Sequence, residues 1–278
     1  MSVHRFLWGR FLDPLRREIN MSEKSQDTLQ QQPNSQIQET PSLEGVLCSI
    51  ETYLNPEIFD NEKLVQQIAR HLGDGKLVVI RKALKEAFAE RLFTCLDQFS
   101  DWGVYEKYEE GFHYHHHNIY DVKLFPPDLM WCGQVFQSDS TKKFIQRLSQ
   151  RDCGGKTQFS ASWYLPGDHS LPHNDLITRD NECRQVAFIW HLTKNWQHNW
   201  GGDLFWCPRT LYVPPSFNTL LLFNVGRNSH HFVTQVSPYA QSKRLAINGW
   251  WTGMENDGER PTHDHNRLIS GGPLIEAI

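Results

Sequence analysis

The sequence has no strong excess of charge of either sign. Its 278 residues carry a formal net charge of -4, and its pI is about 6.4. A chain without a global basic field is a poor candidate for a protein whose obligate partner is a nucleic acid. The six cysteines form no C-x-x-C pair, a pattern typical of reduced thiols in a cytosolic protein and not of a disulfide framework.

Long apolar runs are also missing. No stretch approaches the roughly 18 apolar residues that a membrane-spanning helix needs, and residues 1–20 contain no apolar core like that of a secretory leader. We therefore expect a cytoplasmic protein that makes no membrane association. The sequence leaves its oligomeric state open, and it leaves open whether translation begins at Met1 or at Met21.

Composition divides the chain into four parts. Residues 1–43 include a stretch rich in Gln, Ser, Glu and Pro, which predicts a poorly ordered segment. Residues 44–157 read as a mixed, mainly helical part that packs on the rest. Residues 158–253 form the predicted core domain, and residues 254–278 form a C-terminal tail.

Periodicity places the elements of the second part. Apolar residues at helical spacing predict helices at 61–72, 83–99 and 140–149. A short β-branched run predicts a strand at 77–80. The segment FHYHHHN, residues 112–118, holds four histidines. They could mark a metal site, but no cysteine or carboxylate spacing accompanies them, so we interpret the segment as a polar surface loop.

The third part has a pattern typical of strands and not of helices. Short strands separated by Pro- and Gly-containing turns are expected at 159–164, 186–192, 204–207, 219–223, 231–236 and 244–251. Many short strands at this spacing indicate an antiparallel sandwich or barrel.

Three polar positions in this part suggest chemistry. In His173-Asn174-Asp175 the first and third side chains of an extended segment point to the same side. Alone this pair is weak, because the chain has 14 histidines. A further histidine, His231, opens a strand far downstream. Two histidines and one carboxylate on one face of a metal ion leave adjacent positions open, as non-haem Fe(II) chemistry requires.

The strand that begins at Arg244 adds an anion-binding group. Alternation puts Arg244, Ala246, Asn248 and Trp250 on one face and Leu245, Ile247 and Trp251 on the other. Burying an arginine costs free energy unless it pairs with an anion. A guanidinium can donate two parallel hydrogen bonds to one carboxylate. The alternative is an edge-strand arginine in solvent.

The order H-x-D, then histidine, then arginine is far more specific than its parts. It occurs within YLPGDHSLPHND, RQVAFIWHLTKNW, GGDLFWCP, FNTLLLFNVGRNSHHFVTQV and KRLAINGWW. Over residues 159–253 this succession resembles the 2-oxoglutarate/Fe(II) oxygenases of the prolyl-hydroxylase-like branch. The resemblance implies a mainly β fold with flanking helices, the double-stranded β-helix (jelly roll, cupin-like).

The resemblance also implies roles for individual residues. His173 and Asp175 match the first two iron ligands, and His231 in H-F-V matches the distal ligand. Its neighbour His230 is a rival that would point to the opposite face. Arg244 matches the residue that pairs with the C5 carboxylate of 2-oxoglutarate.

Three further positions complete the expected site. Tyr164 resembles a tyrosine that lines the co-substrate site, and Trp250 matches an aromatic residue beside the iron. His191 departs from the pattern, because the oxygen-sensing prolyl hydroxylases have a tyrosine there that shares the carboxylate with the arginine. A histidine could donate the same hydrogen bond, so 2-oxoglutarate stays the expected co-substrate.

The activity implied is hydroxylation of an unactivated C–H bond with Fe(II), 2-oxoglutarate and O2, with ascorbate as an optional reductant. The first substrate hypothesis is a prolyl residue in a protein. The alternatives are a free amino acid or small metabolite, and a metal-binding cupin-type module without turnover. A nucleic-acid demethylase is disfavoured because no basic stripe interleaved with aromatics lies near the motifs.

Overall fold

The computed structural model describes residues 49–109, 112–179 and 181–254. The predicted poorly ordered segment 1–43 and all but the first residue of the predicted tail 254–278 lie outside the described residues, and both stay predictions. All described residues belong to one compact unit, residues 46–278.

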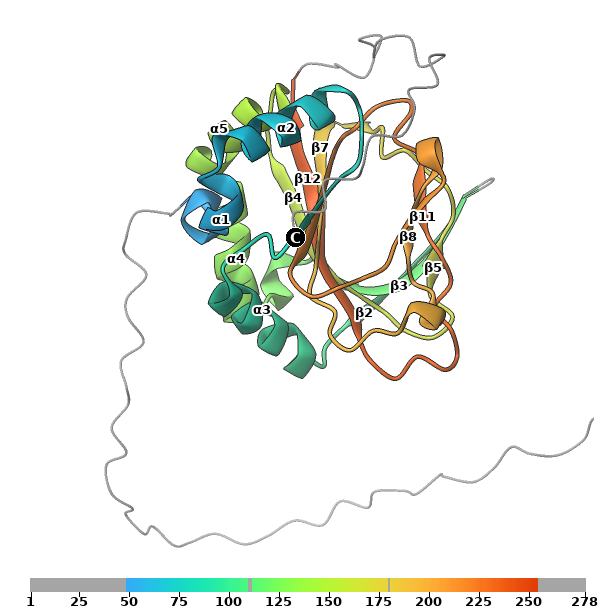
Figure 1. Ribbon diagram of the computed structural model, residues 1–278. Helices are drawn as coiled ribbons and strands as arrows, with labels where there is room; N and C mark the ends of the chain where they lie inside the picture. Colours follow the sequence, from blue (N-terminus) through green and yellow to red (C-terminus); the bar gives the residue numbers. More distant parts are fainter. Residues whose placement is uncertain (1–48, 110–111, 180, 255–278) are drawn as a thin grey trace, which may run out of the picture. The chain divides into compact units, whose positions relative to one another are not determined.

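Two antiparallel sheets face each other across the inner part of this unit (Figure 1). The larger sheet has the path β1-β10-β7-β12-β4-β3-β2, with β5 beside β3 and β6 beside β7, and the smaller sheet has the order β11-β8-β9. The large-sheet strands are β1 Val78–Arg81, β2 Gly103–Glu109, β3 Phe112–Ile119, β4 Thr157–Tyr164, β5 His169–Ser170, β6 Thr178–Arg179, β7 Glu182–His191, β10 Thr219–Asn224 and β12 Arg244–Gly253. Those of the smaller sheet are β8 Leu204–Trp206, β9 Leu211–Val213 and β11 His231–Val233.

Helices cover the other face of the large sheet, on the left in Figure 1. The α-helices are α1 Pro56–Phe59, α2 Glu62–Gly73, α3 Glu86–Gln98, α4 Pro127–Gln137 and α5 Asp139–Ser149; the short 3-10 turns are η1 Ile50–Tyr53, η2 Val122–Leu124, η3 His198–Trp200 and η4 Cys207–Arg209. None of the helices in the described ranges is both long and apolar enough to cross a bilayer.

The alternation of β12 separates two hydrophobic cores. Leu245, Ile247 and Trp251 pack with the helices, and the Trp251 indole donates a 3.0 Å hydrogen bond to the Phe136 carbonyl of α4. On the opposite face Trp250 packs against the core between the sheets. The predicted facing of this strand is therefore confirmed, and its inner face is available for a site.

The histidine-rich segment is a strand and not the surface loop expected from the sequence. β3 pairs along its length with β2, and at its end with β4. Its outward histidines reach a buried carboxylate: Nδ1 of His115 lies 2.6 Å from Asp168 Oδ1, and Nδ1 of His117 lies 3.3 Å from Asp168 Oδ2. The loop prediction was wrong because this strand, apart from Ile119 at its end, is polar or aromatic on both faces, so no alternation of hydrophobicity marks it.

The large sheet also takes strands from the segment before residue 158. β1, β2 and β3 all precede that position, and β1 pairs directly with β10. The segment assigned to a mixed part packing on the jelly roll thus contributes strands to the sheet that carries the site.

Candidate metal and anion site

Three side chains converge between the sheets. His173 and Asp175 lie in the connection after β5, and His231 opens β11. The backbones of His173 and His231 form an isolated antiparallel bridge, with N–H···O distances of 3.0 and 2.8 Å in the two directions. This bridge brings together two segments almost 60 positions apart in the sequence.

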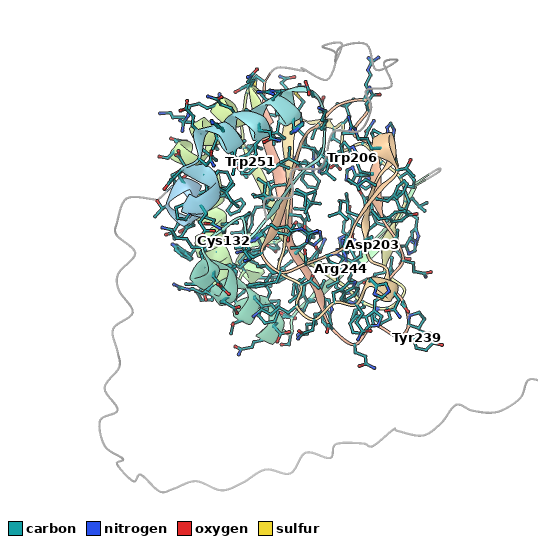
Figure 2. The ribbon with its side chains drawn as sticks, in the orientation of Figure 1. Cys132, Asp203, Trp206, Tyr239, Arg244 and Trp251 are labelled. Atoms are coloured by element: carbon teal, nitrogen blue, oxygen red, sulfur yellow. The ribbon has the colours of Figure 1, made fainter. Side chains whose placement is uncertain are left out.

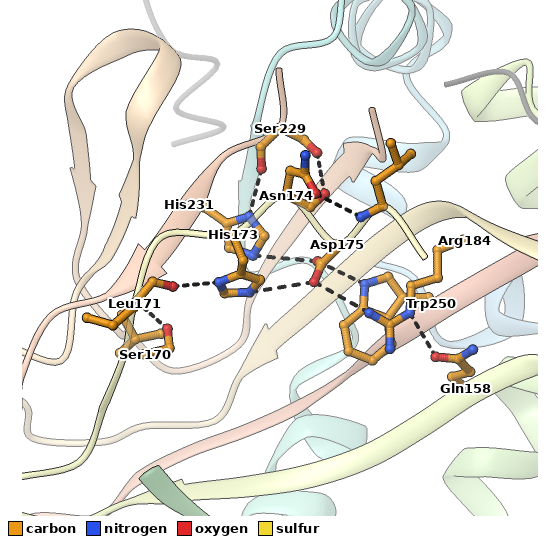
Figure 3. A network of polar contacts seen from close by, with 12 residues as sticks. Gln158, Ser170, Leu171, His173, Asn174, Asp175, Arg184, Ser229, His231 and Trp250 are labelled. Carbon is orange, nitrogen blue, oxygen red and sulfur yellow. Dashed lines mark hydrogen bonds and ion pairs between the residues drawn. The ribbon is translucent and has the colours of Figure 1, made fainter. Parts of the chain in front are cut away.

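Hydrogen bonds orient both imidazole rings. Nδ1 of His173 lies 2.8 Å from the Leu171 carbonyl oxygen, and Nδ1 of His231 lies 2.8 Å from the Ser229 carbonyl oxygen. Because a carbonyl only accepts, Nδ1 carries the proton in each ring and Nε2 keeps its lone pair. Each Nε2 lies 3.5 Å from one oxygen of Asp175, as Figure 3 shows.

These three residues form a metal-binding geometry. One ligand atom from each lies within 4.8 Å of the other two, and no other group of three His, Cys, Asp or Glu residues in the described ranges does so. Burial, followed by the neighbouring His231, lowers the pKa of His173 to about 4. Burial acts to raise the pKa of Asp175, but His231, His173 and Arg184 outweigh it and hold that pKa below its usual value. Neutral imidazoles and an ionised carboxylate are the forms that bind a metal.

A polar network holds the carboxylate from the other side. The Trp250 indole N–H donates a 2.9 Å hydrogen bond to Asp175 Oδ2, and Nη1 of Arg184 lies 3.6 Å from Oδ1. The Arg184 guanidinium carbon lies 3.4 Å from the centre of the Trp250 ring, and Arg184 Nε donates a 2.9 Å hydrogen bond to Gln158. Trp250, expected beside the iron, thus touches a ligand. Sequence reasoning missed Arg184.

Arg244, the first residue of β12, is buried on the inner face (Figure 2). Its Nε donates a 2.5 Å hydrogen bond to the Gly202 carbonyl, and its guanidinium carbon lies 4.4 Å from the centre of the Tyr164 ring. No carboxylate of the described residues lies within ion-pair distance of it. A buried arginine without a paired anion is costly, so the site fits an incoming carboxylate.

His191 lies on the neighbouring strand and is fully buried. Its backbone is in register with Ala246 of β12, and neither ring nitrogen has a hydrogen-bond partner among the described residues. Burial, followed by Arg244, lowers its pKa well below the usual value. An unsatisfied buried imidazole is uncommon in native proteins and requires an explanation. A ligand held by Arg244 provides one.

Two further side chains of the inner face were not expected from the sequence, and both come from β3. The His116 ring stacks on Tyr164 at 4.8 Å, and the Tyr114 ring meets His173 edge-on at 5.0 Å. Burial raises the pKa of Tyr164 to about 12, and burial followed by Arg244 lowers that of His116 to about 3. Recognising β3 as a strand would have placed Tyr114 and His116 on this face.

The rival histidine lies elsewhere. His230 is exposed and outside the cluster, whereas His231 is buried within it. Backbone alternation at the start of β11 separates the two neighbours.

Comparison with known proteins agrees with this geometry. The family described as the 2OG-Fe(II) oxygenase superfamily matches residues 159–252. A curated mouse protein, prolyl 3-hydroxylase OGFOD1, is 30% identical over 121 residues, which cover 40% of this chain. The matched segment spans only about a fifth (21%) of the mouse protein's length.

Solved structures share the fold. A prolyl hydroxylase from Trichoplax adhaerens, in complex with a peptide fragment of the hypoxia inducible factor oxygen degradation domain, superposes with a TM-score of 0.55 at 19% identity, over 73% of this chain and 94% of that one. A Pseudomonas putida prolyl-4-hydroxylase gives a TM-score of 0.51 at 20% identity, over 67% of this chain and 97% of that one. These matches confirm the predicted double-stranded β-helix fold, and residues 159–252 are similar to the 2OG-Fe(II) oxygenase superfamily.

Proposed function

We propose that this chain is an Fe(II)- and 2-oxoglutarate-dependent oxygenase that hydroxylates a prolyl residue of a protein substrate. The observation that carries the proposal is the pairing of two features on one inner face. A cluster of two histidines and one carboxylate shares this face with a buried arginine that has no carboxylate within ion-pair distance in the described part of the chain.

His173, Asp175 and His231 are proposed to hold the iron. The two Nε2 lone pairs and the ionised carboxylate form the donor set that suits non-haem Fe(II) with open coordination positions. The backbone bridge between His173 and His231 fixes their separation before any metal arrives, so little reorganisation opposes binding.

Arg244 is proposed to bind the distal carboxylate of 2-oxoglutarate. Its guanidinium presents a fork that matches a carboxylate, and Tyr164 supports the guanidinium through its ring face. The unsatisfied His191 supplies a second hydrogen-bonding group on the adjacent strand. Together these residues would orient the co-substrate and leave its other end toward the three metal ligands.

Bound there, Fe(II) would supply the activation of O2, with 2-oxoglutarate oxidised to succinate and CO2 while one C–H bond of the substrate becomes C–OH. One oxygen atom of O2 then enters succinate and the other enters the product. The chain's own residues bind, orient and exclude water around these groups. Ascorbate is proposed only as an accessory reductant that keeps the iron in the ferrous state.

The substrate proposal is supported by the relatives. The mouse relative is named as a prolyl 3-hydroxylase, and the Trichoplax enzyme is described in complex with a peptide. A prolyl residue in a protein is therefore the preferred substrate class over a free amino acid or small metabolite.

Mass spectrometry tests the proposal directly. The purified chain is incubated with Fe(II), 2-oxoglutarate and lysate proteins, and peptides are searched for a mass increase of one oxygen at proline. The matched pair His231→Ala and His230→Ala controls for the site, because only the first removes a proposed ligand. Prolyl oxidation with His230→Ala but not with His231→Ala supports the proposal. Oxidation only of added small metabolites would instead favour the other substrate class.

We also propose a cytoplasmic location. The five described cysteines, Cys95, Cys132, Cys153, Cys183 and Cys207, are all free, as expected in a reducing compartment. Fractionation of cells with an antibody against the chain would test this, and recovery in the secreted fraction would contradict it.

A further inference from the structure

A bulge in β7 explains how Arg184 reaches the inner face. β7 and β12 pair residue by residue from His191 to Val186, and the register then shifts so that Thr252 is opposite Arg184. Gln185 is the residue of β7 that this register skips. Bulges of this kind bend a strand and re-aim a side chain, and they are common beside active sites.

Alternation shows what the bulge changes. Along β7, Val186, Phe188 and Trp190 belong to the core that packs on the helices, whereas Ala187 and Ile189 face the space between the sheets. Without the bulge, Arg184 would fall in the helix-facing set. With it, the guanidinium lies over the inner face of Trp250.

The bulge residue itself is held firmly. The Gln185 side-chain amide donates a 3.0 Å hydrogen bond to Cys183 Sγ, and its carbonyl accepts a 2.9 Å hydrogen bond from the Val225 N–H. Gln185 is also almost fully buried. The direction of Arg184 is thus fixed by the backbone as well as by its own side-chain contacts.

Arg184 then contacts groups in three directions. Its Nε donates to Gln158, its flat face covers Trp250, and its Nη1 faces Asp175 Oδ1 at 3.6 Å. A planar guanidinium can satisfy all three at once, and the single ammonium of lysine cannot.

The two oxygens of Asp175 consequently have different surroundings. Oδ2 accepts the Trp250 indole N–H and lies 3.5 Å from His231 Nε2, while Oδ1 lies 3.5 Å from His173 Nε2 and faces Arg184. Asp175 also has a left-handed backbone with φ of 65°, a strained conformation for a residue other than glycine that persists when surrounding contacts fix it.

We propose that Arg184 is a positioning residue for the metal centre. The bulge at Gln185 turns Arg184 toward the inner face, where it contacts both Trp250 and Asp175. These contacts fix the carboxylate so that one of its oxygens binds the ion that His173 and His231 also bind. This inference rests on the proposed function, because it takes these three residues as metal ligands.

Cobalt binding to the full chain tests the inference without turnover. Co(II) affinity is measured by titration, and the visible absorption of the Co(II) protein reports the number and arrangement of ligands. The variants are Arg184→Gln, Arg184→Lys and Trp250→Phe, which removes the indole N–H donor and keeps an aromatic ring. Arg91→Gln is the matched control, because Arg91 also covers a tryptophan (Trp131, 4.8 Å) and pairs with an aspartate (Asp128, 2.6 Å), but within the helical layer.

Arg184→Gln and Trp250→Phe should each weaken Co(II) binding by about 10- to 100-fold, the usual effect of removing a partner of a metal ligand. Both should change the visible spectrum, because Asp175 is then free to bind through both oxygens. Arg184→Lys should give an intermediate loss, and the double variant should lose little more than the single ones, since both act on the same carboxylate. Arg91→Gln should leave affinity and spectrum unchanged.

Wild-type affinity and spectrum in Arg184→Gln would overturn the inference. If that variant fails to fold by circular dichroism, Trp250→Phe decides on the same criteria. The two proposals fail in different ways. A wild-type protein that binds Co(II) but forms no succinate with Fe(II) would contradict the enzymatic function and leave the role of Arg184 to be decided by the cobalt data.

Discussion

Replacing Arg244 by alanine separates the two halves of the proposed site. Arg244 begins β12 and is buried, with Tyr164 beneath its guanidinium and only the Gly202 carbonyl as a hydrogen-bond partner in the described ranges. Its terminal nitrogens are therefore the groups that a co-substrate carboxylate would meet. The three metal ligands lie in other segments and do not depend on it.

The expected magnitude follows from the hydrogen bonds that the substitution removes. A carboxylate forked on the guanidinium makes two charge-assisted hydrogen bonds, each worth about 1.5–3 kcal/mol. Water entering the truncated site recovers part of this, which leaves a net loss of roughly 2–4 kcal/mol. Since about 1.4 kcal/mol corresponds to tenfold in affinity, Arg244→Ala should raise the KM for 2-oxoglutarate by roughly 30- to 1,000-fold.

Two assays measure this effect, and Lys243→Ala is the control. Lys243 is adjacent in sequence, but it pairs with Asp97 at 3.4 Å and lies over Trp163. Succinate formation gives the KM, and thermal unfolding gives binding without turnover. Ligand at about 100 times Kd stabilises by roughly 2.7 kcal/mol, or about 5–10 °C in Tm for a domain of this size. This shift should persist in Lys243→Ala and disappear in Arg244→Ala, while iron binding stays near wild type. Equal losses of iron and 2-oxoglutarate binding would refute the assignment.

Three further predictions concern single positions. His231→Ala should abolish iron binding measured by titration, whereas His230→Ala should keep most of it; the reverse would show that the wrong neighbour was chosen. Gly202→Ala should lower Tm and weaken 2-oxoglutarate binding, because Gly202 has φ of 69° and a Cβ there would lie 2.9 Å from Arg244 Cδ. Gly226→Ala meets no atom within 4 Å and should be close to neutral, and equal effects of the two substitutions would contradict the proposed close approach. His116→Phe should reduce the fall in the free energy of unfolding that accompanies acidification. The folded-state pKa of His116 is lowered to about 3, so between about pH 6.5 and 3 the unfolded chain gains a proton that the folded chain does not, and stability falls as pH falls. Urea unfolding at pH 7 and pH 5 measures this, with His230→Gln as an exposed control, and an unchanged pH slope in His116→Phe would refute the assignment.

The local sequence pattern was sufficient to predict most of the core strands and helices. The strands expected at 159–164, 186–192 and 219–223 are all present, as β4, β7 and β10, because each combines β-branched or aromatic residues with turn signals at its ends. The helices expected at 61–72 and 140–149 are likewise present as α2 and α5. The clustering of His173, Asp175 and His231 was predicted from the order of the motifs and the family resemblance, because local pattern alone does not bring distant segments together.

The rest depends on contacts that local pattern does not carry. β3 is polar and aromatic on both faces, so its strand character and the inward side chains Tyr114 and His116 were not seen. Arg184 lies on the helix-facing side by simple alternation, and only the register shift opposite Trp251 and Thr252 turns it inward. A bulge is a property of two paired strands, and one strand's sequence does not determine it.

The most direct test of the central claim is a crystal structure of the protein with Mn(II), as an inert substitute for Fe(II), and 2-oxoglutarate. We predict an anomalous peak contacted by Nε2 of His173, Nε2 of His231 and one oxygen of Asp175, with the distal carboxylate of 2-oxoglutarate forked on Arg244. A metal bound elsewhere, or an Arg244 guanidinium that contacts no carboxylate when 2-oxoglutarate is bound, would contradict the account.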